Sequence, residues 1–180
     1  MTAYARSRST DKRFYGVAEA LVTDVRNDGQ VKVTYPWFDD HMESEWARVV
    51  QFFAGPGHGA FFIPRINSEV LVAFIHGDMR FPVVLGGLFN GKDLPPGTGT
   101  DLDTHVRHFR IQTPKGHRIS MLDPDAPGAV GAVVIENSNG DSISMSTNGT
   151  MSISTSGALE LQGTVIRLNG RVVAPTMNSI

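Results

Sequence analysis

An eight-residue repeat near the C-terminus constrains this chain more than any other feature. Apolar residues recur in pairs two positions apart: Ile143 with Met145, Met151 with Ile153, and Leu159 with Leu161. Residues two apart lie on one face of a strand, so each copy predicts a short strand with one buried and one solvated face. The pairs Asn139-Gly140, Asn148-Gly149 and Ser156-Gly157 are typical of tight turns and punctuate the copies.

A ribbon with so few apolar residues cannot form a core of its own, because ordering each residue costs roughly 1 to 2 kcal/mol of conformational entropy. Several chains wound around one axis would share their apolar faces and close the open sheet edges. We therefore expect residues from about Val133 to Val173 to form an oligomeric shaft. Its expected shared core consists of Ile135, Ile143, Met145, Met151, Ile153, Leu159, Leu161, Ile166 and Leu168.

Composition excludes several classes of protein. The net charge is −2, which argues against a dedicated nucleic-acid binder, because such proteins usually carry a basic excess. The chain has no cysteine, so it has neither disulfides nor thiolate metal sites. No apolar run reaches the roughly 18 residues that a membrane helix needs, and the polar, basic start at Met1 to Arg13 lacks a signal-peptide core. We expect synthesis in the cytoplasm.

The first 90 residues show closely spaced short strands and hardly any helical period, which is an all-β pattern. The clearest hairpin joins Gly16–Val25 to Gln30–Tyr35 through an Asn-Asp-Gly turn. Further strands are expected at Trp46–Phe53, Glu69–Ile75 and Pro82–Leu88. Five or six strands in this space suit a small closed barrel. The Gly-, Pro- and Asp-rich residues 91–104 then read as a linker.

Polar clusters in the sequence indicate no catalytic or metal site. His105, His108 and His117 are the clustered histidines, but His105 and His108 are three apart and point to opposite faces of an extended strand, so this pair chelates a metal poorly within one chain. The alternative is one histidine from each of three chains around an axis. The run Asp39-Asp40-His41, with Glu43 and Glu45 nearby, is expected in an exposed loop rather than in a pocket that perturbs carboxylate pKa values. Asp123-Pro124-Asp125 lacks the spacing of a calcium loop. We expect no enzyme activity, no metal and no cofactor.

Six aromatic residues supply the expected barrel with rings: Trp37, Phe38, Phe52, Phe53, Phe61 and Phe62. In a barrel that binds nucleic acid, such rings alternate with Lys and Arg on an open face. Here Phe61-Phe62 is followed by Ile63 and Pro64, with Arg65 as the nearest cation. Packing in the core and at subunit interfaces is therefore favoured.

The segment between Ala54 and Gly91 carries a family resemblance. It includes the run GHGAFFIPRINSEVLVAFIHGDMRFPVVLGGLFNG, in which a strand, a His-Gly-Asp turn at His76–Asp78, a second strand and an Asn-Gly pair follow in order. This order and spacing resemble the phage baseplate assembly protein V family, which is related to contractile-tail spikes and to the Vgr proteins of type VI secretion.

The resemblance implies an oligonucleotide/oligosaccharide-binding (OB) barrel at residues 15–90 after an N-terminal arm at 1–14. Beyond the linker it implies a trimeric, intertwined β-helical needle at 105–180. The implied function is the structural central spike of a contractile injection machine, assembled into a virion baseplate or injection particle and driven through the target outer membrane. The implied partners are two further copies, a hub protein above the barrel and a PAAR-type tip protein at Val172, Val173 and Pro175.

Some features of the family have no counterpart here. The linker is too short for the lysozyme domain that some spikes insert, and no histidine follows His117 to build an iron-binding tip. The alternatives are a carbohydrate-binding tail spike or fibre and a nucleic-acid-binding barrel. The shaft contains no Trp, Tyr or Phe between Val133 and Val173 on which sugars could stack. Whether the machine is a phage tail, a bacteriocin, an extracellular injection system or a type VI system is left open by the sequence.

Overall fold

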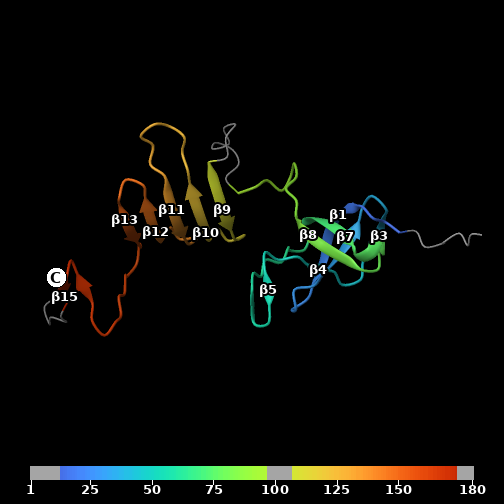
Figure 1. Cartoon of the computed structure of the whole chain (residues 1–180), viewed down its shortest axis with the longest axis horizontal. Coiled ribbons are helices and arrows are strands. Elements are labelled where there is room, and N and C mark those ends of the chain that lie inside the picture. Colours follow the sequence, from blue (N-terminus) through green and yellow to red (C-terminus); the bar gives the residue numbers. More distant parts are fainter. Residues whose placement is uncertain (1–12, 97–106, 174–180) are drawn as a thin grey trace, which may run out of the picture. The chain divides into compact units, whose positions relative to one another are not determined.

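The computed structural model describes residues 13–96 and 107–173. It divides the chain into two compact units, the first ending at Leu94 and the second beginning at Pro95. Within the described residues, the only helix is a single 3-10 turn, η1, at Ile75–Gly77, and strands make up the regular structure (Figure 1). The all-β class expected from the sequence is confirmed.

The first unit is a six-stranded curled sheet in the order β3-β2-β1-β7-β8-β4. Its strands are β1 (Val17–Val25), β2 (Val31–Tyr35), β3 (Asp39–Glu43), β4 (Arg48–Val49), β7 (Glu69–Phe74) and β8 (Pro82–Gly87). The sheet closes on itself because Ala47, just before β4, exchanges two backbone hydrogen bonds with Val31 of β2. Register shifts in β1 and β8 add local twist, which helps the sheet curl. This small barrel is the OB-type fold expected.

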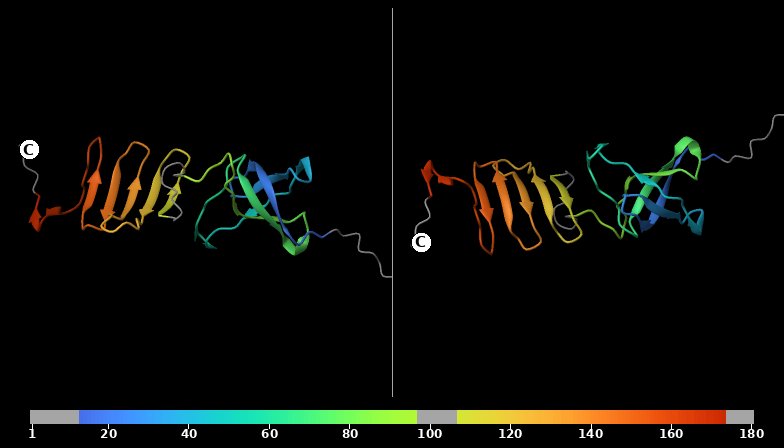
Figure 2. Two further views of the ribbon diagram at one scale, coloured as in Figure 1. Left: turned by 90° about the horizontal axis from the view of Figure 1, so that it is seen from above. Right: turned by 90° about the horizontal axis from the view of Figure 1, so that it is seen from below.

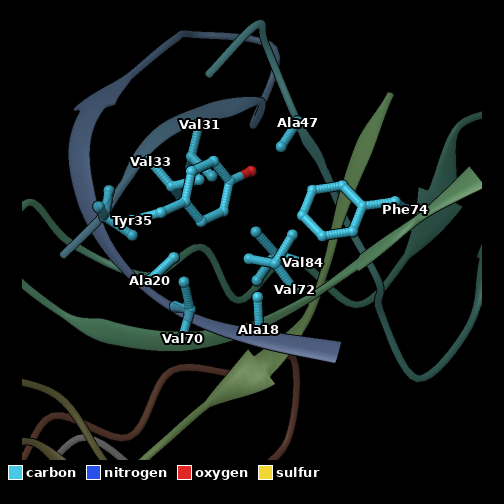
Figure 3. Close-up of a cluster of buried hydrophobic side chains, with 11 residues drawn as sticks. Ala18, Ala20, Val31, Val33, Tyr35, Ala47, Val70, Val72, Phe74 and Val84 are labelled. Carbon is cyan, nitrogen blue, oxygen red and sulfur yellow. The ribbon is translucent and has the colours of Figure 1, made fainter. Parts of the chain in front are cut away.

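The barrel core is formed by strands on which buried and outward-facing side chains alternate. On β1, β2 and β7 every second side chain is buried, and the intervening ones face outward. β7 lies at the place of the strand expected at Glu69–Ile75 and is buried on one face only. The interior is lined by small and β-branched residues and by two rings (Figure 3): Ala18, Ala20, Val22, Val31, Val33, Tyr35, Ala47, Val70, Val72, Phe74 and Val84. β-branched side chains pack well on such a pleated surface.

Three local expectations for the barrel are wrong. The acidic run from Asp39 to Glu43 is strand β3 rather than a loop, because it extends the β1–β2 hairpin by pairing with Thr34 and Tyr35. The strand expected at Trp46–Phe53 is reduced to the two residues of β4, after which the chain leaves the barrel. Six aromatic residues were expected in the core and at subunit interfaces. The core part of this expectation is wrong, because smaller valines and Tyr35 and Phe74 already fill the interior and all six rings are exposed in the single chain; their packing at subunit interfaces stays a prediction: Trp37, Phe38, Phe52, Phe53, Phe61 and Phe62.

A short hairpin, β5 (Ala54–Gly55) and β6 (His58–Gly59), stands between β4 and β7. Figure 1 shows β5 and its loop apart from the barrel strands.

The second unit is a five-stranded antiparallel meander in the order β13-β12-β11-β10-β9. Its strands are β9 (His108–Gln112), β10 (Arg118–Leu122), β11 (Ala132–Glu136), β12 (Ser142–Ser146) and β13 (Met151–Ser154). Figure 2 shows them side by side in one row. Each strand pairs with its sequence neighbour, so turns such as that at Gly149 set the whole topology.

Beyond β13 the structure departs from the sequence expectation. The third copy of the repeat, Leu159 to Leu161, forms no strand. A small two-stranded ladder, β14 (Arg167–Leu168) with β15 (Arg171–Val172), follows it. The carboxylate of Asp141 accepts hydrogen bonds from the Thr155 hydroxyl and the Ser156 N–H, which hold the bend after β13 beside the β11–β12 turn. Beyond this bend the chain does not fold back onto β13, so Leu159 and Leu161 have no neighbouring strand with which to form a ladder.

Candidate functional site

One face of the five-stranded meander carries two continuous rows of large apolar residues. The first row runs across all five strands through directly paired positions: Phe109, Met121, Val133, Met145 and Met151. The second row lies beside it in the same way: Ile111, Ile119, Ile135, Ile143 and Ile153. These ten residues are the apolar face. Because they sit two apart on each strand, all ten side chains project to the same side of the sheet.

Nothing in the described part of the chain covers the apolar face. Its side chains are between 38% exposed at Val133 and 64% exposed at Met151, whereas the barrel core residues are 7% exposed or less. The largest apolar patch on a typical monomer is about 300 to 600 Å² and is often functional. An uninterrupted five-strand apolar surface is therefore a candidate interface.

The opposite face of the same sheet is polar and makes its own contacts. Arg118 pairs with Glu136 at 2.6 Å, Arg110 donates from Nε to the Ser120 hydroxyl at 3.2 Å, and the hydroxyls of Ser144 and Ser152 lie 2.7 Å apart. These residues alternate with the apolar ones, so this face is mostly polar, although Leu122, Ala132 and Val134 also lie on it. A sheet of this kind is typically packed on one side and solvated on the other.

Asp141 is the most connected carboxylate of the second unit. It accepts hydrogen bonds from the Asn137 side-chain amide at 2.7 Å, from the Thr155 hydroxyl at 2.9 Å and from the Ser156 N–H at 3.2 Å. These bonds, that from Asn137 first, lower the pKa of the Asp141 carboxyl. The group ties the β11–β12 turn to the segment after β13, so its role is to fix the sheet rather than to react.

The expected shaft-core residues fall into two groups. Ile135, Ile143, Met145, Met151 and Ile153 all lie on the apolar face. The remaining four lie outside the meander: Leu159 and Leu161 in the strandless segment, the partly exposed Ile166, and Leu168 on β14. Their assignment to a shared core stays a prediction. Of the expected tip-binding residues, Val172 and Val173 are exposed at β15, and Pro175 lies outside the described residues.

Sequence reasoning missed half of the apolar face: Phe109, Ile111, Ile119, Met121 and Val133. The signal was available, because apolar residues two apart also occur in Phe109-Arg110-Ile111 and Ile119-Ser120-Met121. The eight-residue repeat does not include these residues, because β9, β10 and β11 are separated by turns of unequal length.

The polar candidates gather into no reactive site. Among residues 13–96 and 107–173, no three His, Asp or Glu side chains are placed to hold a metal ion. His117 accepts a hydrogen bond from the Ser138 N–H, while His105 lies outside the described residues. Asp125 pairs with Arg107 at 2.9 Å. Glu43 pairs with Lys32 at 2.6 Å, and this contact first, then the Thr23 hydroxyl, lowers the Glu43 pKa.

Burial raises the pKa of one barrel residue, Tyr35, to about 12. Its ring lies in the barrel interior, so this phenol stays protonated and acts as a packing residue (Figure 3). The helices of the described chain include none long and apolar enough to cross a membrane.

Comparison with known proteins identifies the class of the first unit. Residues 15–89 match the family of the type VI secretion system/phage-baseplate injector OB domain. These residues are therefore similar to the OB domain of that family, in agreement with the resemblance seen in the sequence.

Several curated relatives share about half of this chain. The chain is 36% identical over 100 residues to the type VI secretion system spike protein VgrG3 of Vibrio cholerae, covering 53% of this chain and 10% of that protein. It is 40% identical over 105 residues to the spike protein VgrG1c of Pseudomonas aeruginosa, covering 53% and 14%. It is 38% identical over 98 residues to the actin cross-linking toxin VgrG1 of Vibrio cholerae, covering 52% and 9%. The matched region thus spans about a tenth of each relative's length.

Proposed function

We propose that this chain is a subunit of the central spike of a contractile injection machine, a phage tail baseplate or a related particle. In this proposal three copies share one shaft, with the OB barrels as its collar and the C-terminal units as its needle. The match of the barrel to the injector OB-domain family and the names of two relatives as spike proteins support the assignment to an injection machine. The uncovered apolar face supports the association of several copies through their C-terminal units.

The apolar face is the observation that carries the proposal. With each of the ten side chains about half exposed, covering it contributes roughly 1 kcal/mol, half of the value for complete burial. The face as a whole then contributes on the order of 10 kcal/mol per chain. That is comparable to the entire stability of an ordinary domain.

The width of the apolar face favours three copies. Each strand presents two inward residues, which span about 7 Å of strand length. Two such narrow sheets packed face to face would leave both sides of the core open to water. Three sheets around an axis close these sides, and each sheet forms one wall of a prism.

The work of the spike in this proposal is mechanical. Bending or unfolding a shared shaft requires many strand hydrogen bonds and the common core to fail together, which suits a device pushed through an outer membrane. We assign the chain no catalytic role; the toxin activity named for one relative belongs to a protein of which this chain matches only 9%.

Further partners follow from the same proposal. A hub protein would sit above the barrel and contact the N-terminal arm, of which residues 1–12 lie outside the described residues. A PAAR-type tip protein would dock at the C-terminal end, where Val172 and Val173 expose apolar surface. The protein would be made in the cytoplasm and then built into the particle.

Size-exclusion chromatography with light scattering on the full chain tests the proposal. We expect a mass three times that of the 19.5 kDa chain, maintained on dilution. A dimer would contradict the three-sided shaft. A well-folded monomer in dilute solution would contradict the spike assignment altogether.

A further inference from the structure

Four exposed phenylalanines stand together on a part of the barrel unit that the shaft does not explain. They are Phe52, Phe53, Phe61 and Phe62, and they flank the β5–β6 hairpin within residues 51–62, which we term the phenylalanine arm. Phe52 is 87% exposed, the most of any large apolar side chain described.

The arm is a built structure held by its own hydrogen bonds. Ala54 pairs with Gly59, and the Ala60 N–H donates to the Phe53 carbonyl at 3.0 Å. At the base of the arm, the Gln51 side chain accepts from the Phe62 N–H at 2.9 Å and donates to the Phe62 carbonyl at 3.3 Å. The phenylalanines are thus presented on a defined two-stranded ribbon.

The barrel covers little of the phenylalanine arm. Of the four rings, Phe61 meets the barrel at the β1–β2 turn, where its edge packs beside Gly29. Phe52 and Phe62 contact each other with their ring centroids 6.0 Å apart. Their outer surfaces remain in water, where large aromatic surface is costly, so the arm is shaped to meet another surface.

The composition of the phenylalanine arm and the exposed area of its rings indicate what kind of surface it contacts. Residues 51–62 contain no Asp, Glu, Lys or Arg, and a core free of charge and rich in Phe is typical of interfaces between identical subunits. The four exposed rings present on the order of 500 Å². A stable interface buries about 800 Å² per partner, so the arm supplies more than half of what one requires.

The same barrel offers a receptor for such a ring. An open pocket of about 420 Å³ is lined by apolar residues and three charged ones: Trp46, Ile75, Phe81, Pro82 and Val83 with Glu45, Arg48 and Arg80. Guanidinium groups favour the faces of aromatic rings, so the pocket suits a phenylalanine rather than an aliphatic side chain. A projection and a pocket on one chain form a head-to-tail contact, which closes into a ring when copies surround an axis.

We propose that the phenylalanine arm of each copy docks on the barrel of the next copy around the spike axis, with Phe52 entering the pocket beside Trp46 and Phe81. The inference rests on the proposed function for the presence of several copies. It adds a second interface, in the collar, to the one in the shaft. The barrels are then locked to one another instead of being tethered only through their linkers.

Photo-crosslinking of the full chain tests this contact. Benzoylphenylalanine replaces Phe52, which keeps an aromatic ring at that position, and the matched control carries it at Phe89, another exposed barrel phenylalanine. We expect position 52 to give covalently linked copies whose cross-link maps to residues 45–48 or 80–83. Position 89 should give none. A link to any other segment would overturn the pocket as the receptor.

Light scattering on the same samples separates the two proposals. A trimer without cross-links from position 52 would refute the arm contact and leave the spike proposal standing, whereas a monomer would refute both. Flotation with phosphatidylethanolamine and phosphatidylglycerol vesicles examines a lipid occupant. If the wild-type trimer floats and Phe52→Ser/Phe61→Ser does not, the arm binds membrane and the inference is wrong.

Discussion

Ile143 lies directly opposite Ile153 across the β12–β13 hairpin, and both side chains stay exposed, because no other described residue covers them. In a protein that folds alone, such a cross-strand pair would be the centre of a core. Here it lies at one end of a row of five paired isoleucines whose other side is open. The second unit therefore has strand pairing without an interior, and we propose that other copies of the chain supply that interior.

Replacing Ile153 with aspartate should abolish stable trimers. Three like charges would then be buried near one axis without partners, which costs several kcal/mol for each ion. Light scattering of Ile153→Asp should give a monomer or an aggregate. The matched control is Ser152→Asp on the same strand but on the polar face, and it should stay trimeric. An Ile153→Asp protein as trimeric and heat-resistant as the parent would show that Ile153 is not in the shared core.

Shortening Val72 to alanine should destabilise the barrel by about 2 kcal/mol, because a fully buried valine leaves a cavity when it loses two methyl groups. Urea unfolding followed by tryptophan fluorescence measures this effect on the barrel, since both tryptophans, Trp37 and Trp46, lie in that unit. Leu85→Ala, at an exposed position on β8, should change the midpoint little. Equal effects of the two substitutions would contradict the assigned core.

Gly29→Ala should destabilise the barrel more than Gly57→Ala. Both glycines have positive φ, 83° and 75°, so both substitutions carry the roughly 1 to 2 kcal/mol penalty of a left-handed conformation. A Cβ at Gly29 would also lie 2.9 Å from the Phe61 ring, whereas one at Gly57 would meet nothing within 4 Å. The difference between the two unfolding midpoints isolates the clash. If the midpoints coincide, Phe61 does not pack on the β1–β2 turn as described.

Asp141→Asn should lower the thermal midpoint of the shaft at neutral pH but not at acid pH. The pKa of Asp141 is lowered in the folded state, by the Asn137 amide first. A lowered folded pKa means that the stabilisation is present above the unfolded value, 3.8, and is lost as the pH falls through the folded value.

Thermal scans of wild type and Asp141→Asn between neutral pH and pH 2 measure this dependence. The gap between their midpoints should be constant at neutral pH and close below about pH 4. Glu160→Gln, an exposed carboxylate for which the described residues show no hydrogen bond or ion pair, should give no such gap. A gap that persists at the lowest pH would mean that Asp141 acts through its shape and not through its charge.

The alternation of apolar and polar residues along short segments was enough to predict many strands of this protein. Alternation in Val31–Tyr35 and Glu69–Phe74 predicted barrel strands, and the pairs Ile143/Met145 and Met151/Ile153 predicted a strand face that one chain leaves open. These features depend on residues close in sequence and on the two-residue period of a strand, so the sequence alone carries them. The same sequence carried the family signature of residues 57–91, which agrees with the match at 15–89.

Other features depend on contacts between distant residues. Phe109 and Met151 share a row only because four successive reversals bring β9 and β13 into one register. Phe52 is exposed because Tyr35 and the valines fill the barrel first, a question of volume that no local pattern encodes. Leu159 and Leu161 keep the repeat spacing but form no strand, since the chain after β13 does not fold back to pair with it.

The sequence by itself thus determined which residues alternate and where the chain turns, because those preferences act over a few residues. Only the tertiary structure decided which alternating faces meet a core and which stay open, because that depends on the volume available inside the barrel and on the register of strands far apart in the chain.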